Sequence, residues 1–331
     1  MYNGAIFLCQ ENLIMSILNR PQIIDDAALA SMTRKKIEKG RKPGFNIVIE
    51  ILIFFLLFLL SSFCDAAAYM FAWLPAQALQ NRNPDIETIF GISFTDYDLI
   101  TSLFTTGVST VFFIFVGYFF FHRKIRTFGF VKKNALKHYL IGLLAGGVLF
   151  AACVGICVVT GSATVNLSAE GIKPFPFILL IIGWLIQGNS EEVICRGYLL
   201  VSASRRYHVI VGILVNSILF ACMHLANDGI GILPLINLAL FGIVESLIFV
   251  RTGNIWLCSA LHSAWNFVQG NVFGVLVSGG DMGESVFTTV GDPSKSLING
   301  GDFGLEGGLA VTIVYVIAAI ILLFFVKPSK S

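Results

Sequence analysis

The sequence predicts an all-α, polytopic integral membrane protein with about eight transmembrane helices. Of its 331 residues, 56% are hydrophobic and only 13% are charged, and the mean hydropathy is +0.82. These values lie far outside the range of soluble globular domains. In addition, apolar runs of about 20 residues, the length that crosses the hydrocarbon core of a bilayer, recur along the chain.

Charged and polar groups separate these runs and define the elements in order. A polar, basic tail covers residues 1–44, and the membrane domain covers residues 45–331. Basic groups at 122–124 and 132–133 mark one loop, and Arg205 and Arg206 mark another. Spans are expected at about 46–73, 99–121, 139–160, 175–202, 209–225, 233–250, 255–277 and 309–326. The glycine-rich segment from Ser278 to Gly308 has no apolar period and is expected to be a mobile loop.

The loop charges orient these spans. Basic residues gather in the tail, in the 122–137 loop and at Arg205, Arg206, Arg251, Lys327 and Lys330. The alternate loops are acidic, with Asp85, Glu87, Asp96, Glu170, Asp228, Asp281, Glu284, Asp292 and Asp302. The positive-inside rule then places both termini in the cytoplasm. We expect a prokaryotic plasma membrane.

The composition also excludes several classes. A net charge of +2 without a basic stripe among aromatic residues argues against nucleic-acid binding. The seven cysteines include no CxxC pair, so reduced, buried thiols are expected rather than a disulfide framework. The sequence shows no internal repeat, so it gives no support to an inverted-repeat transporter.

The first candidate site is the segment Glu191-Glu192-Val193-Ile194-Cys195-Arg196, which places three charges inside an apolar span. Such charges are costly in a membrane unless they are paired or face water. Glu192 and Arg196 are four residues apart on a helix and are expected to form an ion pair. Glu191 lies about 100° around the helix from Glu192 and lacks a local partner. An acid of that kind can act as a general base.

Two further motifs lie on later spans. His224 ends the segment Phe220-Ala221-Cys222-Met223-His224, and His262 and Asn266 are four residues apart, so both face the same side of a helix. Alone, His224 fits a packing role and the His262 and Asn266 pair fits hydrogen bonding between helices. Together with Glu191, they lie at similar depths and are expected to face one water-filled cavity. Glu50, Asp65 and Glu245 are acids of other spans. Pairing with other helices is expected for them, and lining a cavity is the alternative.

The ordered motifs EExxxR, FxxxH and HxxxN resemble those of the CPBP family of intramembrane endopeptidases. This family includes the type II CAAX prenyl endopeptidases and bacterial proteins linked to bacteriocin processing or self-immunity. The resemblance runs from about Phe175 to Asn271 and includes the approach Arg251-Thr252-Gly253-Asn254-Ile255-Trp256 to the last motif. It implies an all-α membrane protease with its catalytic helices at about 175–277.

The resemblance also implies roles for these residues. Glu191 would take a proton from water that His224 helps to hold, and His262 and Asn266 would donate to the oxyanion. Glu192 and Arg196 would support Glu191. The expected substrate is a membrane-associated peptide or protein, either lipidated or carrying a leader, in contact with membrane lipids.

Three alternatives stay open. The ligand types of Glu191, His224 and His262 would suit zinc, although HExxH is absent and the family implies no obligatory metal or other cofactor. The same charged groups would also suit a proton relay in a proton-coupled transporter. A non-catalytic scaffold or immunity protein is the third alternative.

Overall fold

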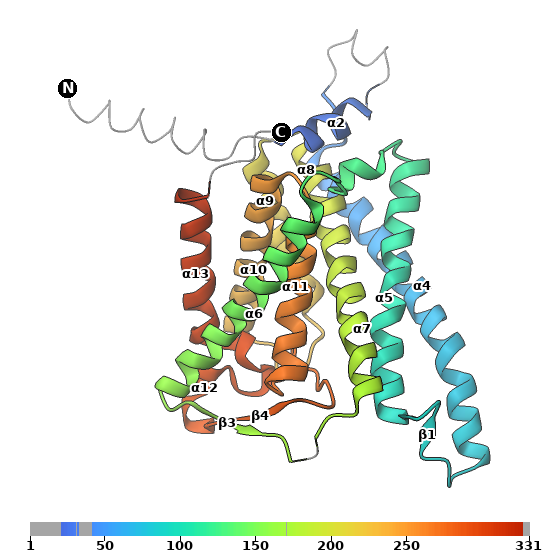
Figure 1. Ribbon diagram of the computed structural model, residues 1–331. Helices are drawn as coiled ribbons and strands as arrows, with labels where there is room; N and C mark the ends of the chain where they lie inside the picture. The colour runs from blue at the N-terminus through green and yellow to red at the C-terminus, as the bar shows by residue number, and fades with distance from the viewer. Residues whose placement is uncertain (1–20, 31, 33–41, 170, 327–331) are drawn as a thin grey trace, which may run out of the picture.

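The computed structural model describes residues 21–30, 32, 42–169 and 171–326, and it is built almost entirely of helices that run side by side (Figure 1). This arrangement confirms the predicted all-α class. The main helices are α4 (Ile47–Arg82), α5 (Phe94–Phe119), α6 (Ala135–Val159), α7 (Pro174–Glu192), α9 (Val209–Met223), α10 (Ile232–Thr252), α11 (Trp256–Phe267) and α13 (Leu309–Phe324).

Each predicted span coincides with helix, and two spans combine more than one element. The π-helix η2 (Val193–Leu200) and α8 (Val201–Ser204) continue α7, and the π-helix η3 (Val268–Val272) continues α11. Within the described residues, five helices are long and apolar enough to cross a membrane: α4, α5, α6, the α7–α8 unit and α10. The shorter apolar helices α9 and α13 have 15 and 16 residues. Eight crossings therefore stay a prediction, whereas a polytopic membrane protein is supported.

The first two helices are longer than the hydropathy pattern indicates. Helix α4 continues past Pro75 to Arg82, because an interior proline removes only one hydrogen bond from a long, otherwise regular helix. A tight hairpin of β1 (Thr88–Ile89) and β2 (Ile92–Ser93) follows. The Ser93 side chain then accepts a hydrogen bond from the Asp96 main chain at 3.1 Å, so this N-cap starts α5 at Phe94.

Glycines on α6 and α7 bring helix α11 unusually close. A Cβ atom at Gly142 of α6 would lie 2.4 Å from the Leu257 carbonyl oxygen, and one at Gly146 would lie 2.2 Å from that of Leu261. On α7, a Cβ atom at Gly188 would lie 2.5 Å from the Ser263 hydroxyl oxygen. Small residues at such spacing let helix backbones approach each other in membranes. Gly142 and Gly146 therefore let α11 pack closely against α6, and Gly188 lets it pack against α7, next to the glutamates of the first motif.

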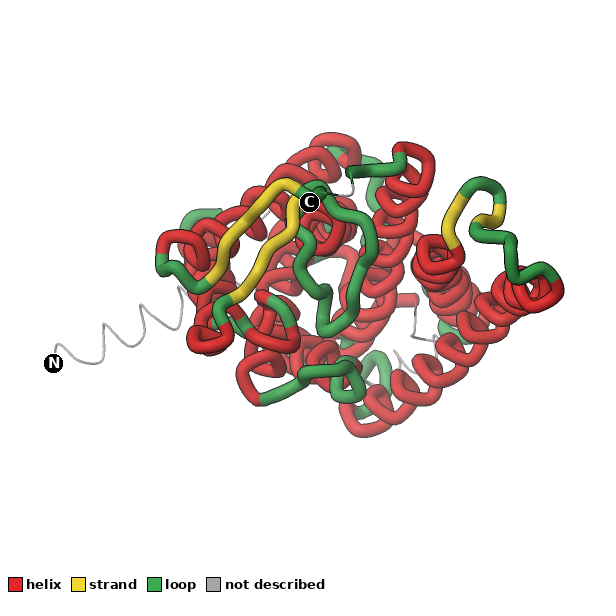
Figure 2. The backbone as a smooth tube through the Cα atoms, turned by 90° about the horizontal axis from the view of Figure 1, so that it is seen from below, coloured by secondary structure: helices red, strands yellow, loops and turns green. Residues whose placement is uncertain are grey.

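The glycine-rich segment (residues 278–308) is folded rather than irregular. It contains β4 (Phe287–Gly291), η4 (Pro293–Lys295), α12 (Ser296–Asn299), η5 (Gly301–Phe303) and η6 (Leu305–Gly307). Strand β4 pairs antiparallel with β3 (Ala163–Leu167), and both lie across the helix ends at the bottom of Figure 1, which Figure 2 shows from below. Asn299 donates to the Ser162 carbonyl oxygen at 2.7 Å and fixes the segment to the end of α6. Sequence periodicity missed this structure because turns and long-range hydrogen bonds, not an apolar repeat, build it.

The opposite end of the bundle carries α2 (Gln22–Ala30), which lies within the predicted polar tail. Its apolar face, with Ile23, Ile24 and Ala27 buried, packs against α8 and the 3-10 helix η1 (Ile125–Phe128). The basic run at residues 34–41, Cys9, and Lys327 and Lys330 lie outside the described residues. The boundary between tail and membrane domain and the cytoplasmic orientation stay predictions.

Of the three acids for which the sequence predicts structural pairing, two have such partners. Glu50 of α4 pairs with Arg205 at 2.8 Å, and Asp65 of α4 accepts hydrogen bonds from the main chain and hydroxyl of Ser109 on α5. The six described cysteines are free, which agrees with the absence of a disulfide framework in this part of the chain. Glu245 of α10 differs from the other two acids, because none of the described residues forms a hydrogen bond with its carboxyl oxygens.

Candidate active site

The helix that carries the first motif changes its winding directly after the two glutamates. Helix α7 ends at Glu192, and the following π-helix η2 is fully buried. Arg123, from the loop after α5, donates to the Gly197 and Tyr198 carbonyl oxygens at 2.6 and 3.4 Å and so satisfies main-chain groups of this turn. Single π-turns inside helices are frequent at functional sites. The winding change fixes where the motif side chains point.

Glu192 and Arg196 form the ion pair that the sequence predicts. Glu192 Oε1 lies 2.8 Å from Arg196 Nη1, and both side chains are fully buried. The Arg196 guanidinium also lies 4.9 Å from the Phe220 ring centroid, on the neighbouring helix α9. A buried pair of this kind depends on both partners, because a single buried charge is strongly destabilising.

His262 connects the two glutamates. Its Nδ1 lies 2.8 Å from Glu192 Oε1, and its Nε2 lies 3.7 Å from Glu191 Oε2. Because Glu192 is paired with Arg196 and accepts hydrogen bonds, Nδ1 is the protonated nitrogen of a neutral His262 ring. Nε2 can then donate to an oxyanion only when the ring carries both hydrogens.

Asn266 reaches Glu191 through a residue that the sequence analysis overlooked. Asn266 Nδ2 donates to Gln187 Oε1 at 3.0 Å, and Gln187 Nε2 donates to Glu191 Oε1 at 2.5 Å. Gln187 lies one turn before Glu191 on the same face of α7, so its spacing could have indicated it. The Asn266 amide carries two hydrogens, and one remains for another acceptor.

His224 lies at the end of α9 rather than within it. The helix ends at Met223, and His224 is its C-cap. The ring nitrogen Nδ1 lies 2.9 Å from the Phe220 carbonyl oxygen, which can only accept, so Nδ1 carries the hydrogen. The Nε2 atom of the neutral ring is therefore an acceptor. An acceptor of this kind can orient a water molecule.

One cavity of about 220 Å³ brings Glu191, His224, His262 and Asn266 together. Its other wall includes Ser278, Met282 and Glu306 of the glycine-rich segment. The cavity therefore extends from the motif residues toward the end of the bundle opposite α2. No lysine or arginine is among the described residues that line it.

Glu306 is a second cavity carboxylate that the sequence did not reveal. It accepts hydrogen bonds from Trp265 Nε1 at 3.2 Å, from the Ser278 main chain at 2.8 Å and from the Ser278 hydroxyl at 3.0 Å. These bonds join the glycine-rich segment to α11. A glutamate among glycines, without an apolar period, gives no local signal of such a role.

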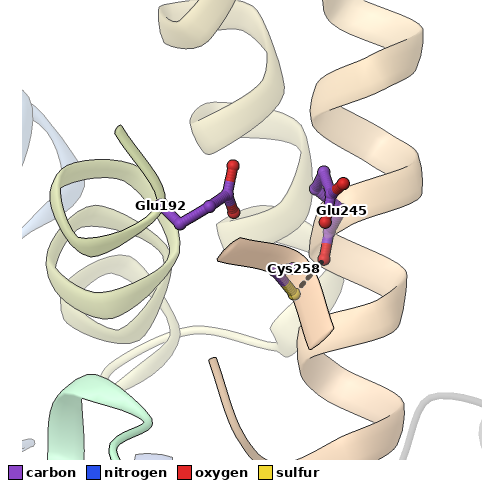
Figure 3. Close-up of side chains that lie close together, drawn as sticks. All are labelled: Glu192, Glu245 and Cys258. Carbon is purple, nitrogen blue, oxygen red and sulfur yellow. Dashed lines mark hydrogen bonds between the residues drawn. The ribbon is translucent and has the colours of Figure 1, made fainter. Parts of the chain in front are cut away.

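The predicted zinc ligands do not form a compact set. Among the described residues, three potential ligand atoms lie within 4.8 Å of one another only at Glu192, Glu245 and Cys258 (Figure 3), and not at Glu191, His224 and His262. In this group the Cys258 thiol donates to the Glu245 main-chain oxygen at 3.5 Å, and Arg196 already neutralises Glu192. A guanidinium beside the ligands disfavours a further cation. The group fits a shared proton better than a metal ion.

The segment that carries all three motifs matches a known protein family. Residues 173–268 match the family described as type II CAAX prenyl endopeptidase Rce1-like. This range contains Glu191, Glu192, Arg196, His224, His262 and Asn266, and the match confirms the resemblance seen in the sequence. No curated protein matches the chain at a significant level.

Proposed function

We propose that this protein is an intramembrane glutamic endopeptidase, because residues 173–268 match the family described as type II CAAX prenyl endopeptidase Rce1-like. It hydrolyses a peptide bond of a membrane-associated peptide or protein. The observation that carries the proposal is the single cavity shared by Glu191, His224, His262 and Asn266. The four side chains supply a base, a water acceptor and two oxyanion donors in one enclosed site.

In the proposed reaction, Glu191 is the general base. Its side chain is 22% exposed, and Gln187 holds one oxygen while the other faces His262. Glu191 takes a proton from a water molecule that His224 Nε2 orients, and the hydroxide adds to the carbonyl carbon of the substrate. The proton then passes from Glu191 to the amine leaving group, and the C–N bond breaks.

The oxyanion receives two hydrogen bonds. His262 donates through Nε2 while Glu192 accepts from Nδ1, and Asn266 donates through the amide hydrogen that Gln187 does not use. Donors that are fixed before the reaction stabilise developing charge without reorganisation. Glu192 and Arg196 are fully buried and hold His262 on the side away from the cavity, so they do not contact the substrate.

The reaction is proposed to need no metal ion. Hydrolytic zinc sites use three protein ligands at about 2.0–2.2 Å from the ion, so their ligand atoms must be close together. Glu191 and His262 lie 3.7 Å apart, but His224 does not complete a compact set with them. A carboxylate and an imidazole acceptor suffice to activate water.

The cavity limits the substrate class. Its volume of about 220 Å³ is below the roughly 300–1,000 Å³ of pockets for drug-sized ligands, so it accommodates only the residues around the scissile bond. Leu99, Leu103, Leu238, Phe241 and Val277 supply apolar walls. We infer that the substrate presents apolar side chains at this position, whether or not it is lipidated or carries a leader elsewhere.

The test is cleavage by purified protein in liposomes. A library of quenched fluorescent apolar peptides is incubated with wild type, with Glu191→Gln and with Glu87→Gln, the same change at an exposed glutamate outside the cavity. Cleavage by wild type and Glu87→Gln, but not by Glu191→Gln, is expected. Equal turnover by the Glu191 variant would end the protease proposal. Glu191-dependent proton or solute flux without cleavage would favour the transporter.

A further inference from the structure

Glu245 is a buried acid that the proposed reaction does not use. It lies in the middle of α10, is fully buried, and within the described part of the chain neither carboxyl oxygen has a hydrogen-bond partner. An ionised carboxylate taken out of water without a partner costs several kcal/mol. Retaining this side chain in a dry helix bundle therefore requires a compensating role.

The unpaired atoms of the neighbouring helix complement those of Glu245. A carboxyl oxygen of Glu192 and one of Glu245 lie within 4.8 Å of each other (Figure 3), and Glu192 Oε2 also lacks a partner among the described residues. Glu192 Oε1, by contrast, is fully engaged by Arg196 and His262, each at 2.8 Å. Among the described residues, Glu192 Oε2 is therefore the acceptor of Glu192 that is left for a donor from Glu245.

Among the described residues, the titratable groups around Glu245 come from its neighbouring helices. Helix α7 and η2 contribute Glu192 and Arg196, α11 contributes Cys258, and α13 contributes Tyr315. The Cys258 thiol donates to the Glu245 main chain. Glu192 and Arg196 already balance each other, so an ionised Glu245 would add a net negative charge to a fully buried site.

We propose that Glu245 is a neutral carboxylic acid that donates its hydrogen to Glu192 Oε2 and thereby positions His262. A rotation about the Glu245 side-chain bonds closes the remaining gap to hydrogen-bond distance. With Oε2 held by Glu245, the Glu192 carboxylate keeps Oε1 directed at Arg196 and His262. The structure thus assigns a positioning chain that runs from Glu245 through Glu192 to His262, at the edge of the cavity.

This inference extends the proposed protease function, but its first test does not depend on activity. Infrared spectra of wild type in lipid are compared with those of Glu245→Gln. The carbonyl stretch of a protonated, buried acid is expected in wild type and is expected to be lost in the variant. Glu87→Gln is the control, because Glu87 is exposed and lies far from α10 in the sequence, so its replacement should leave the band unchanged. A Glu245→Gln difference spectrum with only a carboxylate band would overturn the proposal.

The second test uses the peptide cleaved by wild type. Glutamine is neutral and keeps a donor, so Glu245→Gln should retain kcat within about threefold and keep the wild-type pH profile. Glu245→Met removes the donor, and it should lower kcat at least tenfold and change the pH profile while KM stays similar. Full activity of the Met variant, or an equal loss of kcat in the Gln and Met variants, would contradict the positioning role.

If the Met variant does not fold, the infrared result alone decides. If no peptide is cleaved at all, the infrared result still stands.

Discussion

Replacement of the two adjacent glutamates should affect stability very differently, with a large loss at Glu192 and almost none at Glu191. Glu192 is fully buried and contacts both Arg196 and His262 at 2.8 Å. Glu192→Gln leaves the Arg196 charge buried without a counter-charge, and removing one partner of a buried pair costs about 3–5 kcal/mol. Since about 1.4 kcal/mol corresponds to a tenfold change, the unfolding equilibrium should shift by about 10²- to 4 × 10³-fold.

Glu191→Gln is the matched comparison at the next residue. Its side chain is 22% exposed to the cavity, and a glutamine there can still accept the hydrogen bond from Gln187. Its stability should stay within about 0.5 kcal/mol of wild type, although cleavage is lost. The double change Glu192→Met and Arg196→Met removes both charges and should restore most of the stability, because apolar replacements of buried pairs are often neutral.

The assay is reversible unfolding in mixed micelles with increasing sodium dodecyl sulfate, followed by tryptophan fluorescence. Trp184 and Trp265 are buried beside the cavity and report on loss of packing there. The reasoning is refuted if Glu192→Gln unfolds at the wild-type midpoint. If Glu191→Gln destabilises the protein as much as Glu192→Gln does, the distinction between a buried Glu192 and a cavity-facing Glu191 is also refuted.

Three other predictions concern the oxyanion, the helix contact and the metal. Asn266→Ala should lower kcat by about 10²- to 10³-fold with a small change in KM, the usual cost of one oxyanion donor; an unchanged kcat in the peptide assay would remove Asn266 from the site. Gly146→Ala places a Cβ atom 2.2 Å from the Leu261 carbonyl oxygen, and the resulting overpacking should cost about 1–3 kcal/mol in the micelle assay. Gly155→Ala is its control, because a Cβ atom there meets nothing within 4 Å, and equal losses at both positions would argue against a tight contact. Incubation with 1,10-phenanthroline or EDTA should leave cleavage unchanged, whereas a loss that added zinc restores would show a metal enzyme.

Local spacing in the sequence predicted those parts of the site that lie on one helix. Apolar runs placed the helices, and the four-residue spacing of Glu192 and Arg196 predicted their ion pair, which the structure has at 2.8 Å. The same rule, applied one turn earlier, would have found Gln187. Periodicity works at this range because neighbouring turns of one helix fix the distance between side chains.

The contacts between distant segments could not be predicted in the same way. His262 is 70 residues from Glu192, and their contact depends on the close approach of α7 and α11 at Gly188 and Ser263. Glu306 reaches the cavity from a segment whose turns and strand pairing have no apolar period. Only the packed helices define these distances, so sequence patterns alone leave them open.

The helical geometry of α7 explains why the consecutive residues Glu191 and Glu192 can have different roles. Successive side chains point about 100° apart, so Glu192 faces α11 and the dry interior while Glu191 faces the cavity. His262 contacts both glutamates, with Nδ1 beside Glu192 and Nε2 near Glu191. A change in the buried group therefore reaches the proposed reaction only through the orientation and charge of this one ring. For that reason Glu192 variants should lose activity as well as stability, and the Met pair should restore stability without restoring cleavage.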